Sequence, residues 1–175
     1  MKVSKYALPL RLLHWLMALS LLSLIAVGWY MEGLEKSAFK WELYGLHKSF
    51  GVLLLALWVL RVLARRSSPV PSSVGILKRW EIGLSHATHS LLYLLMLALP
   101  LSGFIMSTID RELAVFGWVV PTITPQSETL GSVAHTLHGP LAYTMLGLVL
   151  LHIAGAVKHR WLDQRHQADV LARML

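Results

Sequence analysis

Cysteine is missing from this sequence of 175 residues, and charged residues make up only 14% of it. The lack of cysteine excludes disulfides, iron–sulfur clusters, zinc–thiolate sites, cysteine nucleophiles and covalent c-type haem attachment. A soluble domain has roughly 25% charged and about 45–50% apolar residues, whereas this chain is 55% hydrophobic with a mean hydropathy of +0.58. The composition therefore excludes a disordered chain and disfavours a soluble domain, and the length allows one domain.

Long uncharged runs account for this composition. There are 20 residues without a formal charge between Arg11 and Glu32, 28 between Glu81 and Asp110, and 29 between Glu128 and Lys158. A bilayer core is crossed by about 20 apolar residues in a helix, and spanning backbone must be helical or form a closed barrel. A fourth run, 41–64, carries its charges near its ends. We therefore predict an all-α, integral membrane four-helix bundle in a single domain (1–175), with helices at about 11–31, 41–63, 85–108 and 132–157.

Positive charge is distributed unevenly between the expected connections. Of the 16 Lys and Arg residues, twelve lie in the N-terminal segment, the 61–84 connection and the C-terminal segment, and four lie on the other side. By the positive-inside rule, the N and C termini are expected to be cytoplasmic. Topology thus explains the net charge of +7, and no nucleic-acid partner is expected. Two connections have a recognisable character: 67–75 is rich in serine and proline, and 116–120 could form a short interfacial element around Trp118.

Histidine is as frequent as aspartate and glutamate together, with nine residues. Ionisable residues within membrane spans are rare, costly and usually functional. By depth, His14 and His152 lie on the cytoplasmic side, and His47 and His138 lie on the outer side. His138 and His152 are about 21 Å apart along a helix and within about 40° of one face. Two bis-histidine sites stacked across a four-helix bundle are what two b-type haems require, so we expect an inner pair and an outer pair at these depths.

The other histidines are weaker candidates. His135 is about 100° away from the face of His152, and His86 and His166 are expected to be anchors or solvated residues. For His89 and His159 the sequence leaves two interpretations open, an anchor at the membrane interface or a functional residue. The residues four positions after the paired histidines are all small, as a flat macrocycle beside its ligand needs: Ala18, Gly51, Ala142 and Ala156. Gly139-Pro140 follows the outer ligand, so the fourth helix could begin or kink there.

These residues resemble the bacterial cytochrome b-561 family, which is related to the cytochrome b subunits of nickel hydrogenases. The matching pieces run through nearly the whole chain: LLHW, LHKSFGVLLL, LRVLARRSSPVP, HSLLYLLMLALPLSGFIMST, VFGW, LHGPLAY and LHIAGAVKHRWLD. The resemblance implies a multi-pass protein of the bacterial inner (plasma) membrane with two noncovalent b haems that exchanges electrons with ubiquinone. The family's ligand histidines fall on His14, His47, His138 and His152, and histidines at His89 and His159 are quinone-site candidates.

Three functions stay open from the sequence. The preferred interpretation is a di-haem b-type membrane cytochrome that passes electrons to or from ubiquinone; some family members are similar to superoxide:quinone oxidoreductases. The first alternative is a membrane anchor that relays electrons from a dehydrogenase or a periplasmic redox protein. The second is a metal-ion transporter with a histidine-lined path, which is disfavoured because the spans have no carboxylate near their midplane.

Overall fold

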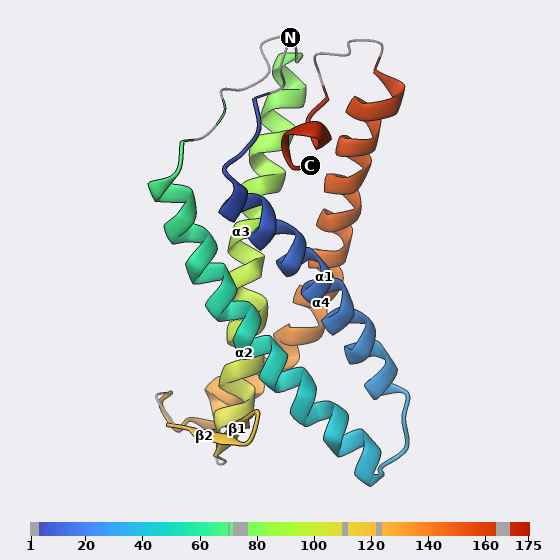
Figure 1. Ribbon diagram of the computed structural model, residues 1–175. Helices are drawn as coiled ribbons and strands as arrows, with labels where there is room; N and C mark the ends of the chain where they lie inside the picture. Colours follow the sequence, from blue (N-terminus) through green and yellow to red (C-terminus); the bar gives the residue numbers. More distant parts are fainter. Residues whose placement is uncertain (1–3, 70, 72–76, 110–111, 122–123, 164–168) are drawn as a thin grey trace.

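The computed structural model describes residues 4–69, 71, 77–109, 112–121, 124–163 and 169–175. This part of the chain contains four helices that are long and apolar enough to cross a membrane, as predicted. They are α1 (Leu8–Glu32), α2 (Ala38–Ser67), α3 (Arg79–Thr108) and α4 (Glu128–Val157). Successive helices run in alternating directions, so α1 and α3 begin where α2 and α4 end (Figure 1). We call this the basic end of the bundle, because most of the Lys and Arg residues flank it.

Polar caps extend the helices beyond the uncharged runs from which they were predicted. The Ser37 hydroxyl accepts a hydrogen bond from the Lys40 backbone N–H, and the Ser127 hydroxyl accepts one from Leu130. At α3, the Lys78 backbone N–H donates to a Glu81 carboxylate oxygen at 2.8 Å. These contacts satisfy backbone N–H groups that the first turn of a helix leaves unpaired. As a result α3 begins at Arg79, before the expected position 85.

The fourth helix neither begins at Pro140 nor is interrupted there. It begins at Glu128 and is continuous to Val157. Its first part is fixed by close packing on α3, since a Cβ atom on Gly131 would lie only 2.9 Å from Cγ1 of Ile109. A helix start near Pro140, which the sequence left open beside the predicted start at about 132, is therefore excluded. The Ser127 cap and the packing on α3 stabilise the part of the helix that precedes Pro140. Membrane helices tolerate such prolines.

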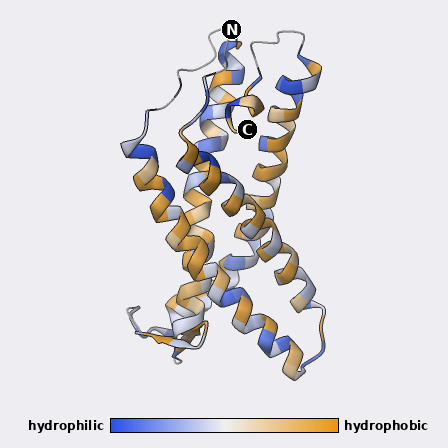
Figure 2. Cartoon of the chain, in the orientation of Figure 1, coloured by the Kyte–Doolittle hydropathy of each residue, from blue (hydrophilic) through white to orange (hydrophobic). Residues whose placement is uncertain are grey.

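The core lies midway along the bundle and is entirely apolar. Its buried members come from all four helices: Met17, Leu21, Ile25, Leu54, Leu57, Leu95, Leu99 and Met145. Outside this core many large hydrophobic side chains are exposed, and the apolar colouring in Figure 2 follows the helices along most of their length. Such an outer surface is suited to lipid rather than water as the surrounding solvent.

The segment expected to form an interfacial element is a β-hairpin at the end opposite the basic end. β1 (Leu113–Val115) pairs antiparallel with β2 (Trp118–Val120), so the all-α prediction misses one small sheet. Both turn residues have positive φ, +50° for Phe116 and +85° for Gly117, as a two-residue hairpin turn requires. The Phe116 N–H donates to the Ser49 hydroxyl at 3.0 Å, and its ring meets Phe50 edge-on. The hairpin is thereby fixed to α2.

The C-terminal segment folds back onto the beginning of α1. The helix α4 continues into a π-helical turn, η1 (Lys158–Leu162), and the last residues form a short 3-10 turn, η3 (Leu171–Arg173). The Tyr6 N–H donates to the Arg173 carbonyl and the Trp15 indole N–H donates to the Met174 carbonyl. The two terminal segments therefore meet at the basic end (Figure 1). Their cytoplasmic location stays a prediction. His166 and most of the 67–75 connection lie outside the described residues.

Candidate functional site

The four histidines predicted as ligands meet in two pairs near opposite ends of the bundle. Near the basic end, the rings of His14 on α1 and His152 on α4 have centroids 6.1 Å apart. Near the other end, the rings of His47 on α2 and His138 on α4 have centroids 6.3 Å apart. Because α4 is continuous between positions 138 and 152, it carries one member of each pair.

A third histidine joins the pair near the basic end. The His89 ring, on α3, lies 5.1 Å from that of His152. Its Nδ1 lies 2.6 Å from the Ser85 carbonyl oxygen, and because a carbonyl can only accept, Nδ1 carries the hydrogen. Nε2 of His89 is then the basic nitrogen. Arg61 adds a positive charge close enough to act on both His14 and His152, and its guanidinium donates to the Leu10 carbonyl at 2.8 Å.

A serine on α3 fixes the tautomer of His138. The Ser102 hydroxyl donates to the Leu99 carbonyl at 2.7 Å, so its oxygen accepts from Nδ1–H of His138 at 2.9 Å. Nε2 of His138 is therefore free of hydrogen and has a lone pair available for a metal. A hydrogen bond on the second ring nitrogen is the usual way in which proteins orient a histidine ligand.

Glycines of neighbouring helices pack directly against the pair far from the basic end. A Cβ atom on Gly28 would lie 3.5 Å from Cε1 of His47, and one on Gly103 would lie 3.0 Å from Cε1 of His138. By contrast, a Cβ atom on Gly51, four residues after His47, would meet nothing within 4 Å, so space is open on that face of α2. Among the described residues, the buried Nδ1 of His47 has no hydrogen-bond partner.

The other sequence candidates are placed more simply. His86 is exposed on α3. His135 does not join a pair; it lines a cavity of about 470 Å³ far from the basic end, together with Lys48, Glu128 and neighbouring residues of α3 and α4. His159 lies in η1 at the basic end, where its Nδ1 is 3.3 Å from an oxygen of Asp163.

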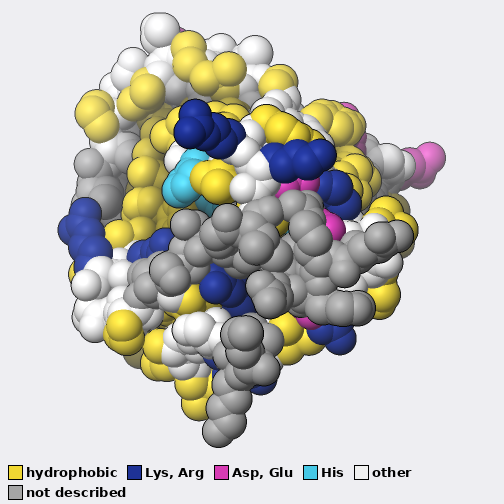
Figure 3. Space-filling model, turned by 90° about the horizontal axis from the view of Figure 1, so that it is seen from above, with side chains coloured by type: hydrophobic (Ala, Val, Ile, Leu, Met, Phe, Trp, Pro, Cys, Tyr) yellow, Lys and Arg dark blue, Asp and Glu magenta, His cyan; other side chains and the backbone are white. Residues whose placement is uncertain are grey.

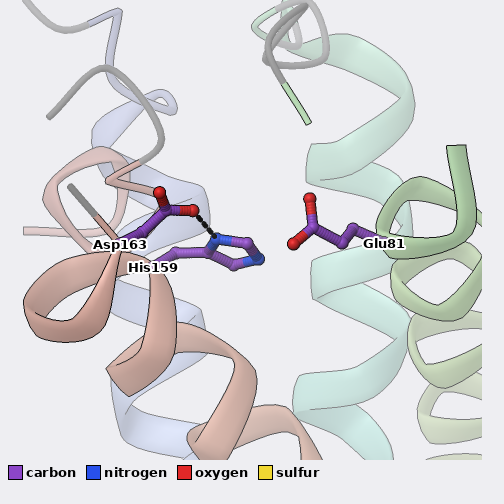
Figure 4. Close-up of side chains that lie close together, drawn as sticks. All are labelled: Glu81, His159 and Asp163. Carbon is purple, nitrogen blue, oxygen red and sulfur yellow. Dashed lines mark hydrogen bonds and ion pairs between the residues drawn. The ribbon is translucent and has the colours of Figure 1, made fainter. Parts of the chain in front are cut away.

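Two carboxylates beside His159 were not predicted from the sequence. Glu81 and Asp163 lie with it in one cluster, shown in Figure 4. The i,i+4 spacing of His159 and Asp163 is a signal that could have identified Asp163. The sequence gives a weaker indication for Glu81, which is an acidic residue that closely follows the basic residues Lys78 and Arg79. Figure 3, which looks onto this end of the molecule, shows Lys and Arg side chains around the few visible acidic ones.

Comparison with known proteins assigns the chain to a family. The family model for prokaryotic cytochrome b561 matches residues 5–175. This chain belongs to the prokaryotic cytochrome b561 family. Among its relatives, cytochrome b561 homolog 2 of Escherichia coli strain K12 is 34% identical over 165 residues, which cover 93% of this chain and 86% of the relative. As the resemblance implied, the chain is a membrane electron-transfer protein of a family that uses b-type haem.

Two further relatives of the cytochrome b561 chain are more distant. Probable superoxide oxidase CybB of Yersinia pestis is 26% identical over 153 residues, which cover 85% of each protein. Cytochrome b561 homolog 1 of E. coli K12 is 25% identical over 169 residues, which cover 93% of this chain and 92% of the relative. Both therefore align with most of the spanning region.

The residues of this cytochrome b561 chain fit a b-type haem. The donors are imidazoles, and the tautomer of His138 leaves Nε2 available for iron. Space is open beside His47 at Gly51. Within the described residues, α4 has little close backbone packing against α1 or α2, the helices that carry its partner histidines. Two helices that hold a flat group such as a haem between them are expected to lie too far apart for close contact of their backbones.

Proposed function

We propose that the chain is a di-haem b-type cytochrome of the bacterial inner membrane that carries electrons between its two ends and reduces ubiquinone. His14 and His152 would hold one haem iron near the basic end, and His47 and His138 would hold the other. His89 and His159 would form the quinone site. Each bound haem supplies one-electron redox chemistry, and the protein orients the ligands and excludes water.

The spacing of the paired rings carries this proposal. A metal–imidazole bond is about 2.0–2.1 Å long, the value known for zinc, so two rings on opposite sides of one metal ion have centroids roughly 6 Å apart. The two proposed pairs have centroids 6.1 Å and 6.3 Å apart. The His89–His152 distance of 5.1 Å is shorter than that arrangement allows, which favours His14 as the partner of His152 and leaves His89 for the quinone.

The remaining residues support transfer between two sites. The apolar core, including the fully buried Met145, lies between the two histidine levels and excludes water from the path. Arg61 supplies positive charge near the basic-end pair, which would offset the negative charge of haem propionates. Lys158 and Arg160 belong to the same end, where they form ion pairs with Glu81 and Asp169.

Superoxide is the donor that we favour. Lys48 and His135 line a cavity far from the basic end. Lys48 directly follows His47 in the sequence, and His135 precedes His138 by three residues, so a small anion in this cavity could approach the proposed outer haem. A relative is named a probable superoxide oxidase, which agrees with this donor. A relay of electrons from a dehydrogenase is the alternative that the experiment must separate.

The test uses purified protein loaded with haem. A pyridine haemochrome assay should give two haems per chain, and superoxide should reduce them and form quinol when a soluble ubiquinone is present. A haem content near zero in fully loaded protein would overturn the haem proposal. Haems that superoxide does not reduce, but that quinol does, would instead indicate the relay.

A further inference from the structure

Three ionisable side chains form a cluster where α3 meets η1, and none of them is a proposed haem ligand. Glu81, His159 and Asp163 are almost fully shielded, with 3%, 12% and 8% of their side chains exposed. One nitrogen of His159 and one oxygen from each carboxylate lie within 4.8 Å of one another. Ionisable groups this close and this buried stay together only if their charges and hydrogen bonds compensate one another.

Asp163 fixes the orientation of His159. It lies one turn after the histidine, and its Oδ2 is 3.3 Å from Nδ1. An ionised carboxylate can only accept, so Nδ1 carries the hydrogen and Nε2 is the nitrogen that can bind and release a proton. In Figure 4 the imidazole extends from Asp163 toward Glu81 on α3. The Asp163 backbone N–H donates to the Lys158 carbonyl at 2.9 Å, the i→i+5 hydrogen bond of a π-helical turn. This bond holds His159 and Asp163 in place relative to each other.

Glu81 is balanced by a cation of its own. Its carboxylate forms an ion pair with Lys158 and also accepts the Lys78 backbone N–H. The Lys158 ammonium lies 5.2 Å from the centre of the Trp80 ring, a cation–π contact that holds it at this position. A metal ion at the three ligand atoms would have to displace this ammonium group. The charge balance therefore favours a proton site over a metal site.

We propose that His159 passes protons to the quinone through Nε2. Asp163 is the positioning residue that orients the imidazole, and the Glu81–Lys158 ion pair faces the imidazole from the side of α3. This inference rests on the proposed quinone reduction at the basic end. One quinone takes two electrons, which two reduced haems supply, and two protons, which come from water at the basic end. His159 transfers these protons one after the other to the quinone oxygens and is reprotonated by water between the two transfers. Each bound haem would supply one of the two electrons.

The experiment compares an acceptor that takes up protons with one that does not. Purified, haem-loaded protein is reduced with dithionite and mixed in a stopped-flow instrument with a short-chain ubiquinone or with ferricyanide, which accepts electrons alone. The variants are His159→Gln and Asp163→Asn. The matched control is His86→Gln, which alters an exposed histidine at the same end of α3. Unchanged haem spectra establish that each variant is folded.

We expect reoxidation by quinone to be slowed about a hundredfold in His159→Gln and about tenfold in Asp163→Asn, within or near the range for loss of a positioned proton donor. Ferricyanide reoxidation and the His86→Gln control should keep the wild-type rates. Asp163→Glu, which retains a carboxylate, should recover much of the lost rate. The slowed reactions should also show a larger solvent deuterium isotope effect than the wild type.

Three outcomes would each overturn one of two statements, the proton role of the cluster or the quinone function. Equal slowing with both acceptors, or wild-type quinone rates in both variants, would overturn the proton role of this cluster while the quinone function stands. Wild-type protein that ferricyanide oxidises and quinone does not would overturn the quinone function itself.

Discussion

Three of the four paired histidines contact different sets of neighbouring side chains or backbone. His138 donates to Ser102 and packs against Gly103, His47 packs against Gly28, and His14 meets the edge of Trp15 at 5.3 Å. The neighbours come from other helices in most cases. The positions of the rings thus depend on how α1, α2 and α3 pack around α4, and a substitution in one helix can change a ligand on another.

Removing one ligand should remove one haem and leave the other. We expect His47→Ala or His138→Ala to eliminate one component of a two-component redox titration, and His14→Ala or His152→Ala to eliminate the other, because each pair lies at its own level. The pyridine haemochrome assay should fall from two haems to about one in each variant. If His89→Ala loses a haem and His14→Ala retains both, the ligand near the basic end is His89.

A single methyl group at Gly103 should disturb only the haem far from the basic end. The added Cβ would lie 3.0 Å from Cε1 of His138, closer than a normal contact, so the ring must move. We expect Gly103→Ala to shift the midpoint potential or the α-band of one haem component. Gly147→Ala on α4 is the control, since a Cβ there meets nothing within 4 Å. Equal shifts in both variants would contradict this local explanation.

The helix α4 is the element that connects the two levels. Its continuity through Pro140 keeps His138 and His152 on one helix, where 14 residues correspond to about 21 Å at the rise of an α-helix. Sequence reasoning predicted the depth and pairing of these histidines, because helix direction and length follow from uncharged runs. It did not predict that His89 would approach His152, since the rotation of α3 about its axis is decided by packing.

We expect the docking of the C-terminal turn to depend on pH. Partial burial opposes ionisation of Asp169, but the Ala172 N–H and the Arg160 guanidinium lower its pKa below the usual value. Stabilisation by this carboxylate is therefore complete above the pKa of free aspartate, about 3.9, and is lost as the pH falls through the lower folded value.

Hydrogen exchange of residues 171–175, corrected for intrinsic rates, should show this loss of docking. We expect it to accelerate only in acid for the wild type, and already at neutral pH in Asp169→Asn. The reason is that the variant lacks the charge that pairs with Arg160. Protection that is the same in Asp169→Asn and in the wild type would show that the backbone contacts to Tyr6 and the Trp15 contact hold the turn alone.

For the molecule as a whole, orientation in the membrane is the main expectation to test. The native chain has no cysteine, so a single introduced cysteine can be labelled without background. We expect a membrane-impermeant maleimide to label Glu35→Cys, between α1 and α2, in intact spheroplasts. Ser4→Cys, at the exposed start of the described chain, should react only after the membrane is opened. The reverse pattern would place the basic end outside.

The sequence was most informative where long stretches share one property and least informative where single contacts decide. Four spans and two histidine levels follow from hydropathy, spacing and helix direction. The β-hairpin was not predicted as such, because strands of three residues carry too short a pattern. Glu81 was missed because it lies on α3 and meets His159 and Asp163 only through the packing of α3 against the end of α4. Asp163 was missed although its i,i+4 spacing from His159 can be read from the sequence.

The apolar layer around Met145 has an electrical consequence. An electron that moves from the outer pair to the basic-end pair travels about 21 Å of a hydrocarbon core about 30 Å thick. No counter-charge can accompany it through that layer, so the step performs work against a potential that is negative inside, up to about 2.3 kcal/mol per 100 mV for a full crossing. Proton uptake by quinone on the same side would add to this work. In the proposed direction, the protein would therefore charge the membrane while it removes electrons from its donor.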